Sequence, residues 1–104
     1  MNNELELLFK QAYQKQQDHQ FEDAISLFIQ ALKINPQHQD SLHFLGLTYA
    51  QLGDMQQALY FLKQANEIKP AAHLLNNLAN LYKKNNQADE AINFYLKAIA
   101  LEPD

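Results

Sequence analysis

The three prolines of this 104-residue chain mark a repeat that strongly limits how the chain can fold. Pro36, Pro70 and Pro103 are separated by 34 and then 33 residues. Each proline is preceded by an alanine at twelve residues, a large apolar residue at eight and a second alanine at five. The members of this pattern are Ala24, Phe28 and Ala31; Ala58, Leu62 and Ala65; and Ala91, Tyr95 and Ala98. A period of this length predicts a row of similar units, each of which needs its neighbour to bury a core.

Two apolar stretches with helical spacing occur in each unit. In the middle unit they are Leu42, Leu45, Gly46 and Tyr49, followed by Ala58, Leu59, Leu62 and Ala65. This i, i+3, i+4, i+7 pattern is typical of amphipathic helices. Short polar segments at 17–20, 53–54 and 85–86 separate the two stretches, and such short links force neighbouring helices to run antiparallel. The sequence therefore predicts six helices arranged as three hairpins.

Small residues are predicted to hold each hairpin together. Facing pairs of them let two helix axes approach closely, where a larger side chain would hold the helices apart. The pairs are Ala12 with Ala24, Gly46 with Ala58, and Ala79 with Ala91. The proline then ends the second helix, because it lacks an N–H donor and disfavours helical geometry in the preceding residue.

These motifs resemble the tetratricopeptide repeat, in which Leu, Gly or Ala, and Tyr are followed by Ala, an aromatic residue, Ala and Pro. The third unit repeats the first part of the pattern with Leu75, Leu78, Ala79 and Tyr82. The resemblance covers essentially the whole chain. It implies an all-α fold, a right-handed superhelix or α-solenoid of three hairpins, with repeats at about 5–38, 39–71 and 72–104 in one domain.

The two ends depart from this pattern. Gln11 and Lys15 stand where later units carry Leu and Tyr, so we expect the first helix to be rolled relative to its counterparts. After the last proline, members of the family usually place one more, solvating helix. Without it, an apolar edge would face water, formed by Phe94, Tyr95, Ala98 and Leu101. Either the chain is a piece of a longer protein, or self-association covers this edge.

Composition and charge exclude several classes of function. Cysteine is absent, so disulfides and thiolate metal sites are excluded. The net charge is −4 and all eight basic residues are Lys, which argues against a nucleic-acid partner. The amino-terminal segment has the wrong order of charge and apolar residues for a secretory signal, and no apolar run is long enough for a membrane span. We therefore expect a cytoplasmic protein.

Catalytic and metal-binding patterns are not found in the sequence. The two glycines, Gly46 and Gly53, form no phosphate-binding loop. The four histidines fall at no metal-binding helical spacing, and the pair Asp40 and His43 is better explained as a solvated helix start. We expect neither an enzyme nor a cofactor or metal.

The resemblance implies that the first helices of the units line an inner groove that binds a peptide or another protein. The candidate groove residues are Phe9, Lys10, Tyr13, His43, Phe44, Leu47, His73, Asn76, Asn77, Asn80, Lys83 and Lys84. The amino-terminal half of this set is aromatic or apolar, whereas the carboxy-terminal half is rich in Asn and Lys. Asn side chains carry both a donor and an acceptor, so they can pair with the backbone of an extended peptide. We predict an apolar anchor at the first two units, with main-chain capture and an acidic group at the third.

Three alternatives stay open. Phe9 and Tyr13 could complete the core of the first unit, and the Asn cluster could be solvated surface. Apolar residues on the outer faces, Ile29, Tyr60 and Leu96, favour self-association. The third unit is also similar to repeats that precede transferase domains, with Asn77 at the place of their ladder asparagine, so the chain could target a larger enzyme. The places at which chaperone-tail clamps of the family carry Lys, Asn and Arg hold other residues here, which argues against an acidic chaperone tail as the ligand.

Overall fold

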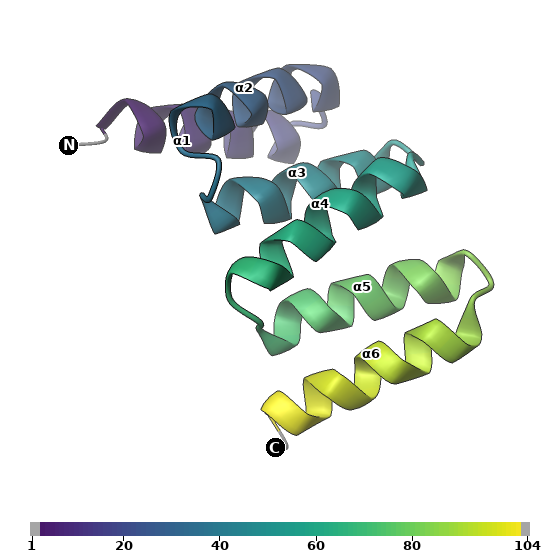
Figure 1. Ribbon diagram of the computed structural model, residues 1–104. Helices are drawn as coiled ribbons and strands as arrows, with labels where there is room; N and C mark the ends of the chain where they lie inside the picture. Colours follow the sequence, from purple (N-terminus) through teal and green to yellow (C-terminus); the bar gives the residue numbers. More distant parts are fainter. Residues whose placement is uncertain (1–2, 103–104) are drawn as a thin grey trace.

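The computed structural model describes residues 3–102 and contains six helices in three hairpins (Figure 1). The helices are α1 (Asn3–Gln17), α2 (Phe21–Ile34), α3 (Gln39–Gln51), α4 (Met55–Ile68), α5 (Ala72–Lys84) and α6 (Ala88–Leu101). The hairpins stack in chain order, and α1 and α6 lie at opposite ends of the stack. The prediction of an all-α solenoid is confirmed. Pro103 lies outside the described residues.

The turns inside the three hairpins share one geometry. His19, Gly53 and Asn86 each have positive φ, at 61°, 85° and 61°. The residue after each of them donates its backbone N–H to the carbonyl five residues earlier, at 2.8–2.9 Å. This left-handed turn satisfies carbonyls at the end of the first helix and reverses the chain.

The links between hairpins contain the repeated prolines Pro36 and Pro70. Helix α2 ends at Ile34, two residues before Pro36, and α4 ends at Ile68, two residues before Pro70. The amide of Gln39 at the start of α3 donates to the carbonyls of Ala65 and Lys69, at 2.8 and 2.7 Å. Gln39 therefore caps the carboxy-terminal end of α4 and ties it to the amino-terminal end of α3.

Small residues lie at the helix crossings as predicted. Ala12, Ala24, Ala58 and Ala79 are fully buried, and Ala91 is 3% exposed. A Cβ added to Gly46 would lie 2.8 Å from Cγ of Leu62, so α3 and α4 are in direct contact there. Stacked ring pairs, Tyr49 with Phe61 and Tyr82 with Phe94, close the second and third hairpins.

The predicted roll of the first helix is wrong. Ala12 is buried in the same register as Gly46 and Ala79. Gln11 is exposed because it occupies the position of Leu45, which packs against Ala12, Ala24 and Phe28 of the preceding unit. No described helix precedes α1, so this position faces solvent.

The predicted composition of the apolar edge at α6 also needs correction. Ala98 is buried against Ala72 and Leu75, and Phe94 is half-buried beside Tyr82. The exposed large apolar residues of α6 are Ile92, Leu96, Ile99 and Leu101. Separately, no helix within residues 3–102 is long and apolar enough to cross a bilayer.

Candidate functional site: the inner face of α1, α3 and α5

The first helices of the three units line a shared hollow of ≈ 380 Å³. Helix α1 contributes its last turn, α3 its carboxy-terminal half, and α5 the face that looks toward α3. The residues that line the inner hollow are Gln16, Gln17, Phe44, Leu47, Ala50, Gln51, Asn77, Asn80, Leu81 and Lys84. A ligand in this hollow would contact all three units at once.

A row of aromatic rings runs across the same helices. On α1, the ring centres of Phe9 and Tyr13 lie 5.8 and 5.3 Å from that of Phe44 on α3, both in edge-to-face arrangements. The ring of Phe44 lies 4.8 Å from His43, which in turn lies 5.2 Å from His73 on α5. Edge-to-face rings at these distances attract one another beyond simple burial. The row therefore forms an ordered apolar wall that joins the units.

His43 is the buried member of this row, with an exposed fraction of 8%. Burial lowers the pKa of His43 from 6.5 to about 4; the nearby His73 also lowers it, while Asp40 acts in the opposite direction. The imidazole is therefore neutral at pH 7, and its Nε2 accepts a hydrogen bond from the amide nitrogen of Asn77 at 3.0 Å. This bond uses the amide nitrogen of Asn77, so the amide oxygen of Asn77 remains available to accept a hydrogen bond from a ligand.

Asn80 and Lys84 follow Asn77 along α5. The amide oxygen of Asn80 accepts a hydrogen bond from the hydroxyl of Tyr95 on α6, which orients this side chain. The amide nitrogen of Asn80 is then the group available to a ligand carbonyl. Lys84 lines the hollow and brings one positive charge to it.

The predicted groove residues fall into three groups. Phe44, Leu47, Asn77, Asn80 and Lys84 line the hollow. Four others belong to the aromatic row, namely Phe9, Tyr13, His43 and His73. The remaining three are exposed elsewhere on the first helices, namely Lys10, Asn76 and Lys83. Since Phe9 also lies 5.9 Å from the buried Phe28, this ring belongs partly to the core of the first unit.

Gln16 is an inner-face residue that the sequence did not reveal. It is 5% exposed, and its amide nitrogen donates to the hydroxyl of Thr48 at 2.8 Å and to the carbonyl of Phe44 at 3.3 Å. These bonds tie α1 directly to α3. The amide oxygen of Gln16 is buried without a partner. Its spacing from Ala12, one helical turn, was the available signal that this glutamine lies on the buried side.

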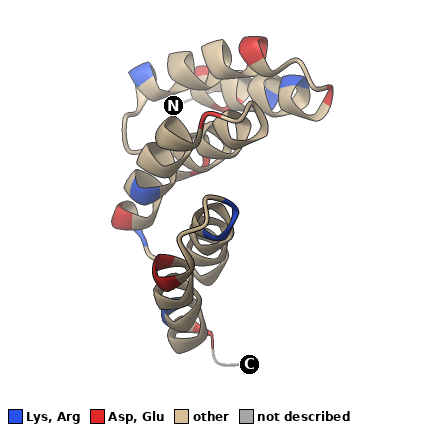
Figure 2. Ribbon diagram, turned by 90° about the vertical axis from the view of Figure 1, so that its right-hand side faces the viewer, with Lys and Arg blue, Asp and Glu red and all other residues tan. Residues whose placement is uncertain are grey.

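The inner face combines apolar rings with amides and one ammonium group. Within the described part of the chain, no three His, Cys, Asp or Glu side chains come together to hold a metal ion. Charged residues are scattered over the helices and do not form one dense patch (Figure 2). Such a surface can bind a polypeptide through apolar anchors and backbone hydrogen bonds.

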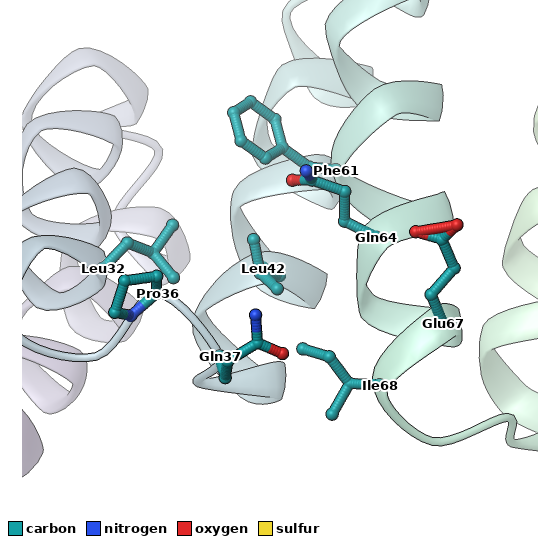
Figure 3. A pocket seen from close by; sticks show the side chains of 8 residues that line it. All are labelled: Leu32, Pro36, Gln37, Leu42, Phe61, Gln64, Glu67 and Ile68. Carbon is teal, nitrogen blue, oxygen red and sulfur yellow. The ribbon is translucent and has the colours of Figure 1, made fainter.

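A second hollow, of ≈ 400 Å³, lies between the first and second units beside the link that joins them. Figure 3 shows Leu32 and Pro36 on one side of it, with Phe61, Gln64 and Ile68 of α4 on the other. Glu67 supplies its one charged side chain. This hollow contacts two units rather than three, so the inner hollow is the better candidate site.

Comparison with known proteins assigns a family to the repeats. A sequence profile described as the tetratricopeptide repeat matches residues 4–71, and a second profile of the same description matches residues 72–104. Anaphase-promoting complex subunit 3 of Schizosaccharomyces pombe is 25% identical over 93 residues, which is 88% of this chain. An N-terminal acetyltransferase A complex subunit-like protein of the same organism is 26% identical over 98 residues, or 93% of this chain. The chain spans about 14% of the length of each of these relatives.

Solved structures share the fold. The crystal structure of MamA superposes with a TM-score of 0.92 over 95% of this chain and 58% of that chain, at 22% identity. A mutant of the O-GlcNAc transferase from Thermobaculum terrenum superposes with a TM-score of 0.86 over 96% of this chain and 19% of that chain, at 26% identity.

Proposed function

The chain belongs to the tetratricopeptide repeat family, and from that premise we propose that its inner face binds an extended segment of another protein. Repeats of this family generally mediate protein–protein interaction; one named relative is by name a subunit of a complex, and the other a complex subunit-like protein. The observation that carries the proposal is the inner hollow, because residues of all three first helices converge on it.

The chemistry of the inner face suggests how such a segment would lie. One apolar side chain of the ligand would pack against Tyr13 and Phe44, whose rings meet edge to face. Its backbone would then run toward α5, where Asn77 offers an acceptor and Asn80 a donor. An acidic residue or a terminal carboxylate would pair with Lys84 beyond them.

Peptide display provides the test, because the ligand is not identified. Twelve-residue random peptides would be selected on the wild-type chain, and the affinities of single synthetic peptides measured by fluorescence anisotropy. We expect Tyr13→Ala and Lys84→Glu each to weaken binding about tenfold, as anchors at the centre of an interface do. Lys33→Glu on α2 is the matched control, since it makes the same charge change outside the hollow.

The proposal has two clear points of failure. If Asn77→Ala, Asn80→Ala and Lys84→Glu all leave the affinities of the selected peptides unchanged, the third unit takes no part in binding. If Tyr13→Ala and Lys84→Glu are no worse than Lys33→Glu, the inner face is not the binding site.

A second candidate function is suggested by the similarity to the transferase structure, which extends over 96% of this chain. Here the same inner face would carry protein substrates to an enzyme rather than hold a permanent partner. The exchange rate separates the two functions: a substrate-presenting face releases its peptides within milliseconds, whereas a stable scaffold holds them for seconds or longer.

A further inference from the structure

The second hollow, between the first and second units, shares no lining residue with the inner hollow. It is lined by Leu32, Pro36, Gln37, Leu42, Phe61, Gln64, Glu67 and Ile68. Its floor is apolar, since Leu42 is buried and both Leu32 and Phe61 are half-buried. Figure 3 shows Leu42 of α3 between the residues of α2 and those of α4. The volume of ≈ 400 Å³ is within the range of about 300–1,000 Å³ that is typical of ligand pockets, so one long side chain can enter.

The polar groups of the second hollow are acceptors of hydrogen bonds. Gln64 and Glu67 are three residues apart in α4, so they lie on the same side of this helix. The amide nitrogen of Gln64 donates to the hydroxyl of Tyr60 at 3.1 Å, which leaves the amide oxygen of Gln64 available to a ligand. Glu67 is exposed, and an ionised carboxylate can only accept hydrogen bonds. A ligand with several N–H donors would therefore satisfy this rim.

The charge at the second hollow is negative. Glu67 lines it, whereas no Lys or His does so within the described part of the chain. Lys63 of the same helix is directed elsewhere, because its ammonium lies 5.5 Å from the ring centre of Tyr82 on α5. The chain as a whole has a net charge of −4. Both the local charge and the net charge therefore favour a cationic ligand.

An arginine side chain matches both parts of the second hollow. Its methylene stem can pack on the apolar floor while the charged guanidinium stays at the rim. The guanidinium presents its N–H donors in a planar fork, which suits a carboxylate with an amide oxygen beside it. A lysine ammonium has the same charge but is more strongly hydrated and lacks the fork. The arrangement therefore favours arginine over lysine.

The contact between the second and third units does not repeat this chemistry. Aligned by the repeat, Asn66 corresponds to Leu32, Lys97 to Gln64 and Ala100 to Glu67. The amide oxygen of Asn66 accepts a hydrogen bond from the backbone N–H of Ala71 at 3.3 Å, so a polar group replaces the apolar leucine. A cation there would meet the positive charge of Lys97 and no counterpart of Glu67. The acidic, apolar hollow is therefore a feature of one contact in this chain and not of the repeat.

We propose that the second hollow is a docking site for an arginine side chain of a partner protein. The methylene stem of the arginine lies on Leu32, Leu42 and Phe61, and its guanidinium binds the carboxylate of Glu67 and the amide oxygen of Gln64. The site is built from both units, so it exists only where the first and second hairpins are packed together. It is separate from the inner hollow and goes beyond the function proposed above.

Three capped tripeptides provide the probe. The first, acetyl-leucine-arginine-leucine-amide, is titrated into the intact, isotope-labelled chain and followed by NMR. The other two replace arginine with lysine or with citrulline, which has nearly the same shape but no charge. We expect the arginine peptide to shift the backbone amide signals of Gln64 and Glu67 saturably. The citrulline and lysine peptides should each bind about threefold more weakly, which is the size of effect expected at a solvent-exposed carboxylate.

Two substitutions in α4 make the test specific. Glu67→Gln should weaken binding of the arginine peptide about threefold and remove its advantage over citrulline. Gln64→Lys should weaken binding at least as much, because it introduces the positive charge that α6 carries at Lys97. Glu90→Gln on α6 is the matched control, since it removes one carboxylate outside the second hollow. Circular dichroism should report unchanged helix content for all three variants.

Several results would overturn the proposal. One is the absence of saturable shifts at Gln64 and Glu67, and another is equal binding of the arginine and citrulline peptides. Equal affinities for the arginine and lysine peptides would show that the hollow selects charge and not the guanidinium. An equal effect of Glu67→Gln and Glu90→Gln would exclude the carboxylate of Glu67 as the partner of the cation. Shifts confined to Asn77 and Asn80 would place the peptide in the inner hollow.

Discussion

Gly46 determines how closely α3 approaches α4. A methyl group there would lie 2.8 Å from Cγ of Leu62 and 3.1 Å from the carbonyl oxygen of Ala58. The first and third units tolerate alanine at this position because a flat ring, Phe28 or Tyr95, replaces the branched leucine. The second unit therefore has glycine in place of alanine on α3, and a branched leucine in place of an aromatic ring on α4.

Gly46→Ala tests this exchange. Alanine favours a helix over glycine by roughly 1 kcal/mol, but overpacking a core costs about 1–3 kcal/mol. We expect a net loss of about 1 kcal/mol in the free energy of unfolding, measured with urea. A stabilised variant would mean that Leu62 can move aside at little cost.

His43 makes the stability of the fold depend on pH. Its pKa in the folded chain is lowered from 6.5 to about 4, so between these values the unfolded chain binds more protons than the folded chain. The stability from keeping His43 neutral is therefore present above pH 6.5 and is lost as the pH falls toward 4. The loss should be on the order of 2 kcal/mol, because part of the effect is screened by solvent.

The comparison with His43→Phe isolates this effect. Phenylalanine occupies the equivalent position in the first unit, at Phe9, and does not titrate. The difference in unfolding free energy between wild type and variant should change between pH 6.5 and pH 4, in favour of the variant at low pH. A constant difference over that range would show that His43 is not the cause of the pH dependence.

Single-residue features differ in how far the sequence predicts them. The alanines and prolines recur with the repeat, so their structural roles follow from spacing alone. Gln16 bonds to residues 28 and 32 positions away, and Asn80 bonds to Tyr95 of the other helix of its hairpin. Such contacts depend on how the hairpins stack, which the apolar pattern does not encode. The roll of α1 expected from Gln11 was wrong because this position was compared with later units, which have another unit packed in front of them.

At the scale of elements, the three hairpin turns share one backbone geometry but form it with different residues. All three need a left-handed residue, which glycine adopts freely and other residues adopt at a cost. The sequence predicted all three turns as short polar segments, and two of these segments contain residue types, Gly53 and Asn86, that adopt a left-handed conformation readily. Nothing in the residue type of His19 predicted a left-handed conformation there.

Opposite substitutions in two turns should have opposite effects. His19→Gly is expected to stabilise the chain by about 1 kcal/mol, since it removes a strained backbone conformation. Gly53→Ala is expected to destabilise it by about the same amount, although no atom lies within 4 Å of the added methyl group. Thermal unfolding of both variants beside wild type provides the measurement, and two shifts of the same sign would contradict this account.

At the scale of the whole molecule, the core is continuous from the first unit to α5 and thinner at α6. Leu32, Tyr49 and Phe61 contact both larger clusters, and one of these clusters includes Leu74, Leu78 and Leu81 of α5. The buried residues of α6 are Ala91 and Ala98. Each unit of a solenoid is stabilised by its neighbours, so a helix with one uncovered face opens first.

Hydrogen exchange should reveal this gradient. We expect backbone amides of α3 and α4 to be the most protected and those of α6 to be the least protected among the six helices. NMR of the intact chain provides the measurement. Equal protection in all six helices would instead indicate that the chain unfolds as one cooperative unit.

The residues that line the inner hollow all come from the first helix of a hairpin, α1, α3 or α5. Ligand choice can therefore be changed by substitutions on these helices, at positions such as Lys84, while the sequences of α2, α4 and α6 stay as they are. A protein engineer could give this small solenoid a new cargo and keep half of its helices unaltered.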